Sequence, residues 1–158
     1  SENIELCLGL FCYESFSFNE NKIKQFEKDF KIKFNDIEKI NIKEKLMIKL
    51  KETTPGEKII SIPFDRLTEY MRPSCNSCRD FTNIYADISF GGLGSPEKHT
   101  TVITRNDKGK KILRKVIDAG VIKCLKLDSN HIENIKTLIT KYSNKKLERF
   151  NDFTRREL

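Results

Sequence analysis

The segment from Ile4 to Cys12 constrains the fold most, because it is apolar at nearly every position. A short run of this kind is typical of a β-strand that is buried on both faces of a sheet. No apolar run in the sequence approaches the roughly 18 residues that a membrane-spanning helix needs. The sequence therefore predicts a folded chain without a membrane span, with its first strand inside the protein.

The remaining apolar residues follow helical or alternating spacing in short segments that end at Gly, Pro, Asn or Asp. These patterns predict helices over 19–30, 65–71, 107–119 and 129–150, and strands over 37–42, 46–50, 59–62, 85–90, 100–105 and 121–127. The first three strands of this set are expected to form an antiparallel meander. The fold class predicted is α+β, a single domain of residues 1–150 with a mixed β-sheet and flanking helices. A polar, frayed tail is expected over 151–158.

The net charge of +7 is a weak guide to function, because the charges are mixed along the chain. The lysines are scattered among acidic residues and asparagines, and no block of five or six like charges occurs. A solvated surface explains this pattern, and nucleic-acid binding is not expected because no helix carries a basic stripe. The excess of positive charge would also suit an anionic ligand or partner. The polar, acidic start Ser1–Glu5 is unlike a secretory signal, so we expect a cytoplasmic protein.

Cysteine usage points to metal or redox chemistry. The chain has five cysteines, an odd number, and two of them form the Cys-x-x-Cys motif Cys75–Cys78. This spacing lets two thiolates converge on one zinc ion or iron–sulfur cluster, or form a dithiol redox pair. Cys12 is the third candidate ligand, although a core position fits it equally well. Cys7 and Cys124 are expected to pack as small apolar side chains.

A fourth metal ligand is not evident from the sequence. His99 and His131 are the only histidines, and each is expected on the surface. The fourth ligand is therefore expected outside this chain, or the site has fewer than four.

The second candidate site is a glycine-rich loop that follows a predicted strand. It comprises Gly91, Gly92, Gly94 and Ser95, with Thr100 and Thr101 shortly after it. Three glycines in four positions permit close approach of the backbone to a ligand, and free N–H groups can cradle a phosphate. A plain turn between two strands is the alternative. Asp87 lies in the strand before this loop, and we expect either a buried functional acid or a carboxylate that faces solvent or caps a turn.

Four segments in order, residues 8–16, 72–81, 86–96 and 100–105, resemble motifs of the beta subunits of coenzyme F420-reducing hydrogenases and dehydrogenases. They are the end of the first strand, the Cys75–Cys78 motif, the glycine loop and the strand after it. The resemblance extends from about residue 6 to residue 120. It identifies the chain as similar to the C-terminal domain of that family.

The resemblance implies an iron–sulfur flavoprotein that carries FAD and a [4Fe-4S] cluster. Its flavin would exchange a hydride with coenzyme F420, and hydrogenase or dehydrogenase redox subunits would be its electron-transfer partners. By position, Cys12, Cys75 and Cys78 would be cluster ligands. The flavin would lie near Gly91, Gly92, Gly94, Ser95, Thr100 and Thr101. Family members are roughly twice this length, so an N-terminal half of the same subunit is a further expected partner. No catalytic acid or base is assigned.

The alternative hypothesis is a non-enzymatic module in which Cys75 and Cys78 bind a structural zinc and the basic surface contacts an acidic protein partner. It accounts for the charge and for the Cys-x-x-Cys motif. It leaves the glycine loop and the position of Cys12 without an explanation.

Overall fold

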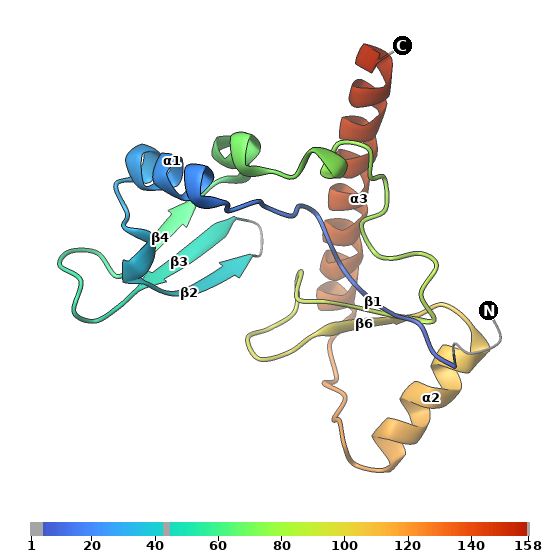
Figure 1. The fold of residues 1–158 in the computed structure, drawn as a ribbon. Helices are drawn as coiled ribbons and strands as arrows, with labels where there is room; N and C mark the ends of the chain where they lie inside the picture. Colours follow the sequence, from blue (N-terminus) through green and yellow to red (C-terminus); the bar gives the residue numbers. More distant parts are fainter. Residues whose placement is uncertain (1–4, 43–44, 158) are drawn as a thin grey trace. The chain divides into compact units, whose positions relative to one another are not determined.

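A computed structural model describes residues 5–42 and 45–157, except for the side chain of residue 157 (Figure 1). The chain divides into two compact units. Residues 14–75 form one unit, here called the inserted unit, and residues 1–13 and 76–158 form the other, here called the main unit. Ile4, the expected start of the first strand, and Leu158, the end of the expected tail, lie outside the described residues.

The inserted unit is a three-stranded antiparallel sheet covered by one helix. Helix α1 (Glu20–Phe30) precedes strands β2 (Ile37–Ile42), β3 (Leu46–Leu50) and β4 (Ile59–Ile62), which pair in the order β2-β3-β4. Three 3₁₀ helices complete it: η1 (Phe34–Asp36), η2 (Phe64–Tyr70) and η3 (Pro73–Cys75). The predicted meander and the predicted helix are confirmed, and Asn19 caps α1 by accepting the Lys22 N–H at 3.0 Å.

Aromatic side chains fill the core of the inserted unit. Phe26 is 0% exposed and packs with Leu46 and Ile48, which the alternation along β3 turns toward α1. The rings of Phe18, Phe30, Phe34 and Tyr70 surround Phe26 at centroid distances of 4.7–6.1 Å. The Tyr70 hydroxyl donates to Asp29 at 2.6 Å, and burial together with that carboxylate raises the pKa of Tyr70.

The main unit contains the mixed sheet that the sequence predicts. Strands β1 (Leu8–Leu10), β5 (Ile88–Gly91) and β6 (Thr101–Thr104) lie in the order β1-β5-β6. β1 runs parallel to β5, with Leu8 opposite Ile88, and β6 runs antiparallel to β5. Helices α2 (Asp107–Asp118) and α3 (Ser129–Glu157) follow (Figure 1). The α+β class with a mixed sheet and flanking helices is thus confirmed.

The first strand departs from the expectation of burial on both faces. Leu8 and Leu10 are 58% and 70% exposed, because β1 lies at the edge of the sheet and one of its faces is open within this chain. Only Gly9 is buried, and a Cβ there would overlap the side chain of Asn83. The near-continuous apolar run therefore reflects an open apolar sheet face and not an internal strand.

Two further expectations for the C-terminal third are wrong. Residues 121–127 form no strand, and their apolar side chains are largely exposed. The segment 151–157, expected as a frayed tail, continues α3 without a break. No glycine or proline interrupts this segment. Arg155 and Arg156 in the last turn stabilise the helix, because their positive charges lie at the negative end of the helix dipole. Among the described helices, none combines the length and apolar character needed to cross a membrane.

Candidate cofactor pocket and cysteine segments

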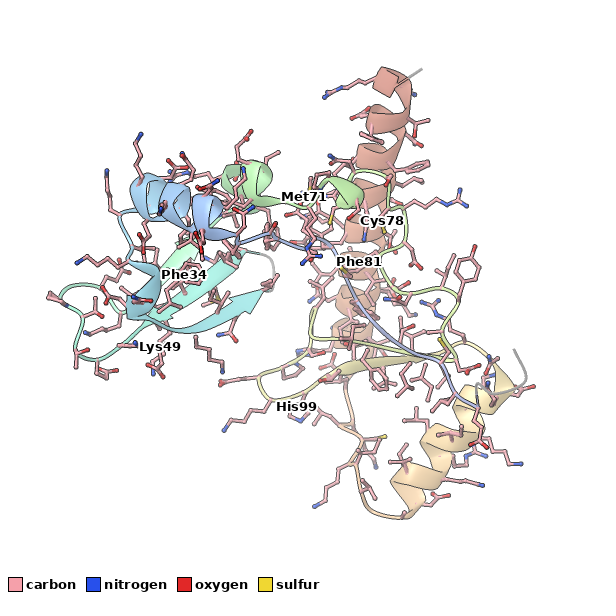
Figure 2. The ribbon with its side chains drawn as sticks, viewed as in Figure 1. Phe34, Lys49, Met71, Cys78, Phe81 and His99 are labelled. Atoms are coloured by element: carbon pink, nitrogen blue, oxygen red, sulfur yellow. The ribbon has the colours of Figure 1, made fainter. Side chains whose placement is uncertain are left out.

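A cavity of about 710 Å³ lies in the main unit beside the glycine loop. Its walls come from the connection between β5 and β6, from β6 itself, from the irregular segment 122–127 and from the first turns of α3. Apolar side chains form most of the surface, among them Phe90, Val102, Ile135 and Ile139. His99 lies in the connection between β5 and β6 (Figure 2). A cavity of this size and character is typical of a small-molecule or cofactor site.

The charged groups along this cavity are cationic. Lys98, Lys123 and Lys136 line it together with His99, and no carboxylate is among the described residues that line it. Lys136 forms an exposed ion pair with Glu133 at 3.4 Å. The predominance of positive charge over an apolar surface favours a ligand that joins an apolar group to an anionic group.

Half of the predicted loop residues reach the cavity. Ser95, Thr100 and Thr101 line it, and the hydroxyls of Ser95 and Thr101 lie 2.7 Å apart. This pair offers donors and acceptors at one place on an otherwise apolar wall. Gly91, Gly92 and Gly94 are not among the lining residues.

The glycines instead allow the loop to pack closely against the protein. A Cβ at Gly91 would overlap the ring of Phe11. Gly94 has a φ of +72° and lies against α3, where a Cβ would meet Ile135 Cγ1 at 3.0 Å. Gly92 has open space around its Cα. Two of the three glycines therefore hold the loop in position beside the cavity.

Alanine at Gly91 is expected to lower the free energy of unfolding by about 1–3 kcal/mol, because the added methyl group must displace the Phe11 ring. Alanine at Gly92 is the matched control and is expected to change it by less than about 0.5 kcal/mol, since nothing lies within 4 Å of its Cβ position. Urea unfolding of both variants measures the difference. Equal losses would show that Phe11 does not restrict this position.

Asp87 is a buried structural acid that joins three elements. Its carboxylate accepts the Cys7 N–H at 2.8 Å and the Asn106 amide at 2.6 Å, and it pairs with Lys108 at 2.8 Å. The Lys108 bond, then the Asn106 amide and the Cys7 N–H, lower the pKa of Asp87 to about 2. Asn106 is also the N-cap of α2, so Asp87 fixes the start of that helix to the sheet. Asp87 is buried, as one of the two expectations states, but no functional role is shown for it, and its partners give it a structural role.

The Asp87 contacts make stability depend on pH in the acid range. Because the pKa of the folded state is lowered, the stabilisation is complete above the unfolded value near pH 4 and is lost as pH falls toward 2. Asp87→Asn is therefore expected to have a lower thermal midpoint than the wild type at pH 7, and the gap should narrow between pH 4 and pH 2. Thermal scans across this range test the expectation. A gap that is constant with pH would contradict it.

The candidate metal ligands are distributed over both units. Cys12 and Cys78 belong to the main unit, whereas Cys75 ends the inserted unit. Cys12 donates its N–H to the Phe81 carbonyl at 2.8 Å, which places it beside the segment that follows Cys78. Phe81, labelled in Figure 2, stacks on Tyr142 of α3 with ring centroids 6.0 Å apart.

Cys75 has the surroundings of a sulfur that accepts hydrogen bonds. It is buried, and its Sγ accepts the Ser15 N–H at 3.3 Å. The same thiol also donates to the Ser15 carbonyl at 3.7 Å, and the Cys78 thiol donates to the Asp80 carbonyl at 3.6 Å. Within residues 5–42 and 45–157, no three His, Cys, Asp or Glu side chains are grouped to hold a metal ion.

The other cysteines and the histidines are at the surface. Cys7 and Cys124 are exposed, and so is Cys12, so the expectation that Cys7 and Cys124 pack in the core is wrong, as is the core alternative for Cys12. The main chain of Cys7 leads to the edge strand, and Cys124 lies in the irregular segment beside the cavity. His99 and His131 are exposed, as expected.

Sequence reasoning missed the cavity walls contributed by 122–127 and by α3. The apolar side chains of 122–127 have the spacing of a strand, and those of α3 have the spacing of a core-facing helix. Neither spacing indicates that the side chains line a cavity. The signal that could have indicated the cavity is a lysine beside the apolar residues of each segment, Lys123 in one and Lys136 in the other. Both lysines line the cavity, where the two segments converge.

Comparison with solved structures defines the class of the fold. The chain resembles a chain of the F420-reducing [NiFe] hydrogenase complex from Methanosarcina barkeri, with a TM-score of 0.76 and 26% sequence identity. The match covers 96% of this chain and 50% of that chain. The fold is therefore that of about half of one chain of that hydrogenase complex.

Curated relatives and a family model narrow the class. A coenzyme F420 hydrogenase subunit beta of Methanothermobacter thermautotrophicus is 29% identical over 94% of this chain and 50% of its own length. A coenzyme F420-dependent sulfite reductase of Methanocaldococcus jannaschii is 33% identical over 92% of this chain and 22% of its own length. The chain belongs to the family described as the C terminus of the coenzyme F420 hydrogenase/dehydrogenase beta subunit, and the family model matches residues 1–130. It spans about half or less of the length of these relatives.

Proposed function

We propose that this chain is the flavin-binding, C-terminal part of an F420-linked oxidoreductase and that FAD occupies the cavity of the main unit. The supporting observation is the basic, largely apolar cavity of about 710 Å³, whose walls come mostly from the segment that the family model matches. Relatives named for coenzyme F420 include both a hydrogenase subunit and a sulfite reductase. Electrons would pass between a hydrogenase or dehydrogenase redox subunit and coenzyme F420.

The residues along the cavity fit a flavin. Val102, Ile135 and Ile139 offer an apolar surface to a flat ring system and exclude water from it. The Ser95 and Thr101 hydroxyls can hydrogen-bond the polar edge of that ring. Lys98 and Lys123 supply cations for the phosphates.

The chemistry of hydride exchange belongs to the cofactor. A bound flavin accepts and donates a hydride, and the protein positions it and sets its electrostatic surroundings. The proposed role of this chain is therefore to bind the flavin ring, to keep one face of the ring free for coenzyme F420 and to hold anionic groups at the lysines. An N-terminal half of the subunit would complete the site, in agreement with the length of the relatives.

We further propose that Cys12, Cys75 and Cys78 are ligands of a [4Fe-4S] cluster. Two contacts support this, one in each unit: Cys12 lies beside Phe81, and Cys75 lies beside Ser15. No catalytic step is derived through the cluster.

The test is purification without oxygen, followed by FAD titration and by iron, sulfide and zinc analysis of the chain. We expect about one FAD per chain, bound more weakly as ionic strength rises because lysines hold the phosphates. We also expect iron and sulfide that are lost in Cys75→Ser and retained in the control Cys7→Ser. One zinc per chain with no FAD binding would reject the proposal in favour of a structural-zinc module.

A further inference from the structure

A tight turn between β5 and β6 holds His99 at the cavity. The His99 N–H donates to the Pro96 carbonyl at 3.1 Å, and Lys98, at the third position of this turn, has the positive φ of 64° that is typical of type II turns. Nδ1 of the His99 ring lies 2.8 Å from the Glu97 carbonyl oxygen. The residue lines the cavity of the main unit (Figure 2). Main-chain contacts of one turn therefore orient an imidazole at the space that the proposed flavin would occupy.

The contact with Glu97 decides which ring nitrogen can serve a ligand. A carbonyl oxygen only accepts hydrogen bonds, so the proton of the neutral His99 ring lies on Nδ1. Nε2 then carries a lone pair in the neutral ring and an N–H in the protonated ring. Among the described residues, none forms a hydrogen bond or ion pair with Nε2. Protonation therefore converts Nε2 from an acceptor into a cationic donor.

His99 differs from the other titratable groups that line the cavity in the pH range where such groups ordinarily change charge. An imidazole ordinarily takes up its second proton between about pH 5 and pH 8. Below about pH 7.5, lysines are ordinarily charged and thiols ordinarily neutral. The other titratable lining residues are Lys98 in the turn, Lys123 and Cys124 in segment 122–127, and Lys136 in α3. Within the described part of the cavity wall, histidine alone offers a charge that changes near neutral pH.

Two carboxylates next to these groups do not line the cavity. Glu97 belongs to the same turn as His99, and Glu133 pairs with Lys136 at 3.4 Å. Both side-chain types are ordinarily ionised above about pH 5, so each adds a constant charge over the range in which an imidazole titrates. A pH dependence of ligand binding in that range would therefore come from the ring.

We propose that His99 is a binding residue for the phosphates of the flavin, and that binding of FAD is coupled to uptake of one proton from solvent by its ring. In the protonated ring, Nε2 donates to a phosphate oxygen, and its positive charge adds to that of Lys98 and Lys123. This inference rests on the proposed flavin site and adds to it a residue that acts in only one of its two charge states.

The direction of the pH effect follows from linkage. A phosphate beside the ring favours the charged form, so the FAD complex retains the proton to a higher pH than the free protein does. The gain in affinity is therefore complete at acidic pH and is lost as the pH rises through the range where the bound ring is deprotonated. The phosphates of FAD remain ionised over this range, so the ligand itself adds no such dependence.

The experiment measures FAD affinity of the full chain by fluorescence titration at about pH 5 and about pH 7.5, at constant ionic strength. The wild type is compared with His99→Gln, which is never charged, and with His99→Lys, which is charged at both pH values. His131→Gln is the matched control, because His131 is also exposed and lies outside the cavity wall, where it contacts Asp128 at 3.2 Å. Riboflavin, which has the same ring system and no phosphate, is titrated in parallel.

Wild-type chain is expected to bind FAD about 2–5-fold more tightly at the acidic pH, which is the range that an exposed ion pair contributes. His99→Gln should bind at both pH values as the wild type does at the higher one. His99→Lys should bind at both as the wild type does at the lower one. His131→Gln should keep the wild-type pH dependence, and the affinity for riboflavin should not change with pH.

The outcomes separate this inference from the flavin site on which it rests. A wild type that binds no FAD at either pH rejects the flavin site and the role of His99 together. FAD binding that is independent of pH, or that keeps its pH dependence in His99→Gln, rejects the role of His99 alone. An equal pH dependence for riboflavin and FAD would overturn the assignment to the phosphates, because the ring system would then be the group contacted.

Discussion

Replacing Phe26 by alanine is expected to lower the free energy of unfolding of the inserted unit by about 3–5 kcal/mol. Phe26 is fully buried, and its ring contacts those of Phe18, Phe30, Phe34 and Tyr70. The change removes apolar surface from the core and leaves a cavity bordered by rigid rings, which cannot collapse to fill it. Urea unfolding followed by tyrosine fluorescence measures the loss, since Tyr70 lies against the substituted side chain.

Ile59→Ala is the control for this prediction. Ile59 lies in β4 of the same unit but is 53% exposed, so the same kind of truncation there should cost less than about 1 kcal/mol. A Phe26→Ala loss that is no larger than the Ile59→Ala loss would mean that the aromatic cluster does not stabilise the inserted unit.

Replacing Val102 by tryptophan is expected to weaken FAD binding at least about 100-fold, which corresponds to about 2.7 kcal/mol of binding free energy. Val102 lines the cavity from β6, and an indole at this position occupies the volume that the proposed flavin ring needs. Protein fluorescence during FAD titration measures the affinity. Circular dichroism of the free variant establishes whether the fold is retained.

Val121→Trp is the matched substitution outside the cavity. Val121 is 73% exposed and is not among the lining residues, so tryptophan there should leave FAD affinity within about twofold. Two folded variants with equal affinity would place the flavin elsewhere in the protein.

The inserted unit could be predicted from the sequence because its signals are local. The alternation from Leu46 to Leu50 defines the central strand, and the turn residues around Gly56 separate it from β4. Asn19 and Asn106 predict the starts of α1 and α2 because an N-cap acts within three residues.

The errors arose where position depends on distant segments. Apolar residues from 121 to 127 have the spacing of a strand, but no strand pairs with them, and most of their side chains border the cavity. Apolar residues in β1 likewise predict burial, although the strand lies at a sheet edge. Lys146 is 1% exposed, and its burial has no sequence signal, since a lysine in a helix is expected on the surface.

The cavity could be predicted only in part for the same reason. Ser95, Thr100 and Thr101 belong to one loop, so a single local pattern indicates all three. The opposite wall comes from α3, more than 30 residues later, and no local pattern connects it to the glycine loop.

The nesting of one unit within the sequence of the other has a consequence for the order of folding. Pairing of Leu8 with Ile88 closes a loop of about 80 residues, which is slow in an unfolded chain because of its entropic cost. The inserted unit folds from local contacts, and bonds between Ser15 and Arg72 and between Ser15 and Cys75 hold its two ends together. Once it has folded, β1 and β5 are joined by a short tether. Early folding of residues 14–75 would therefore accelerate the pairing of β1 with β5, because it brings the two strands close together before they pair.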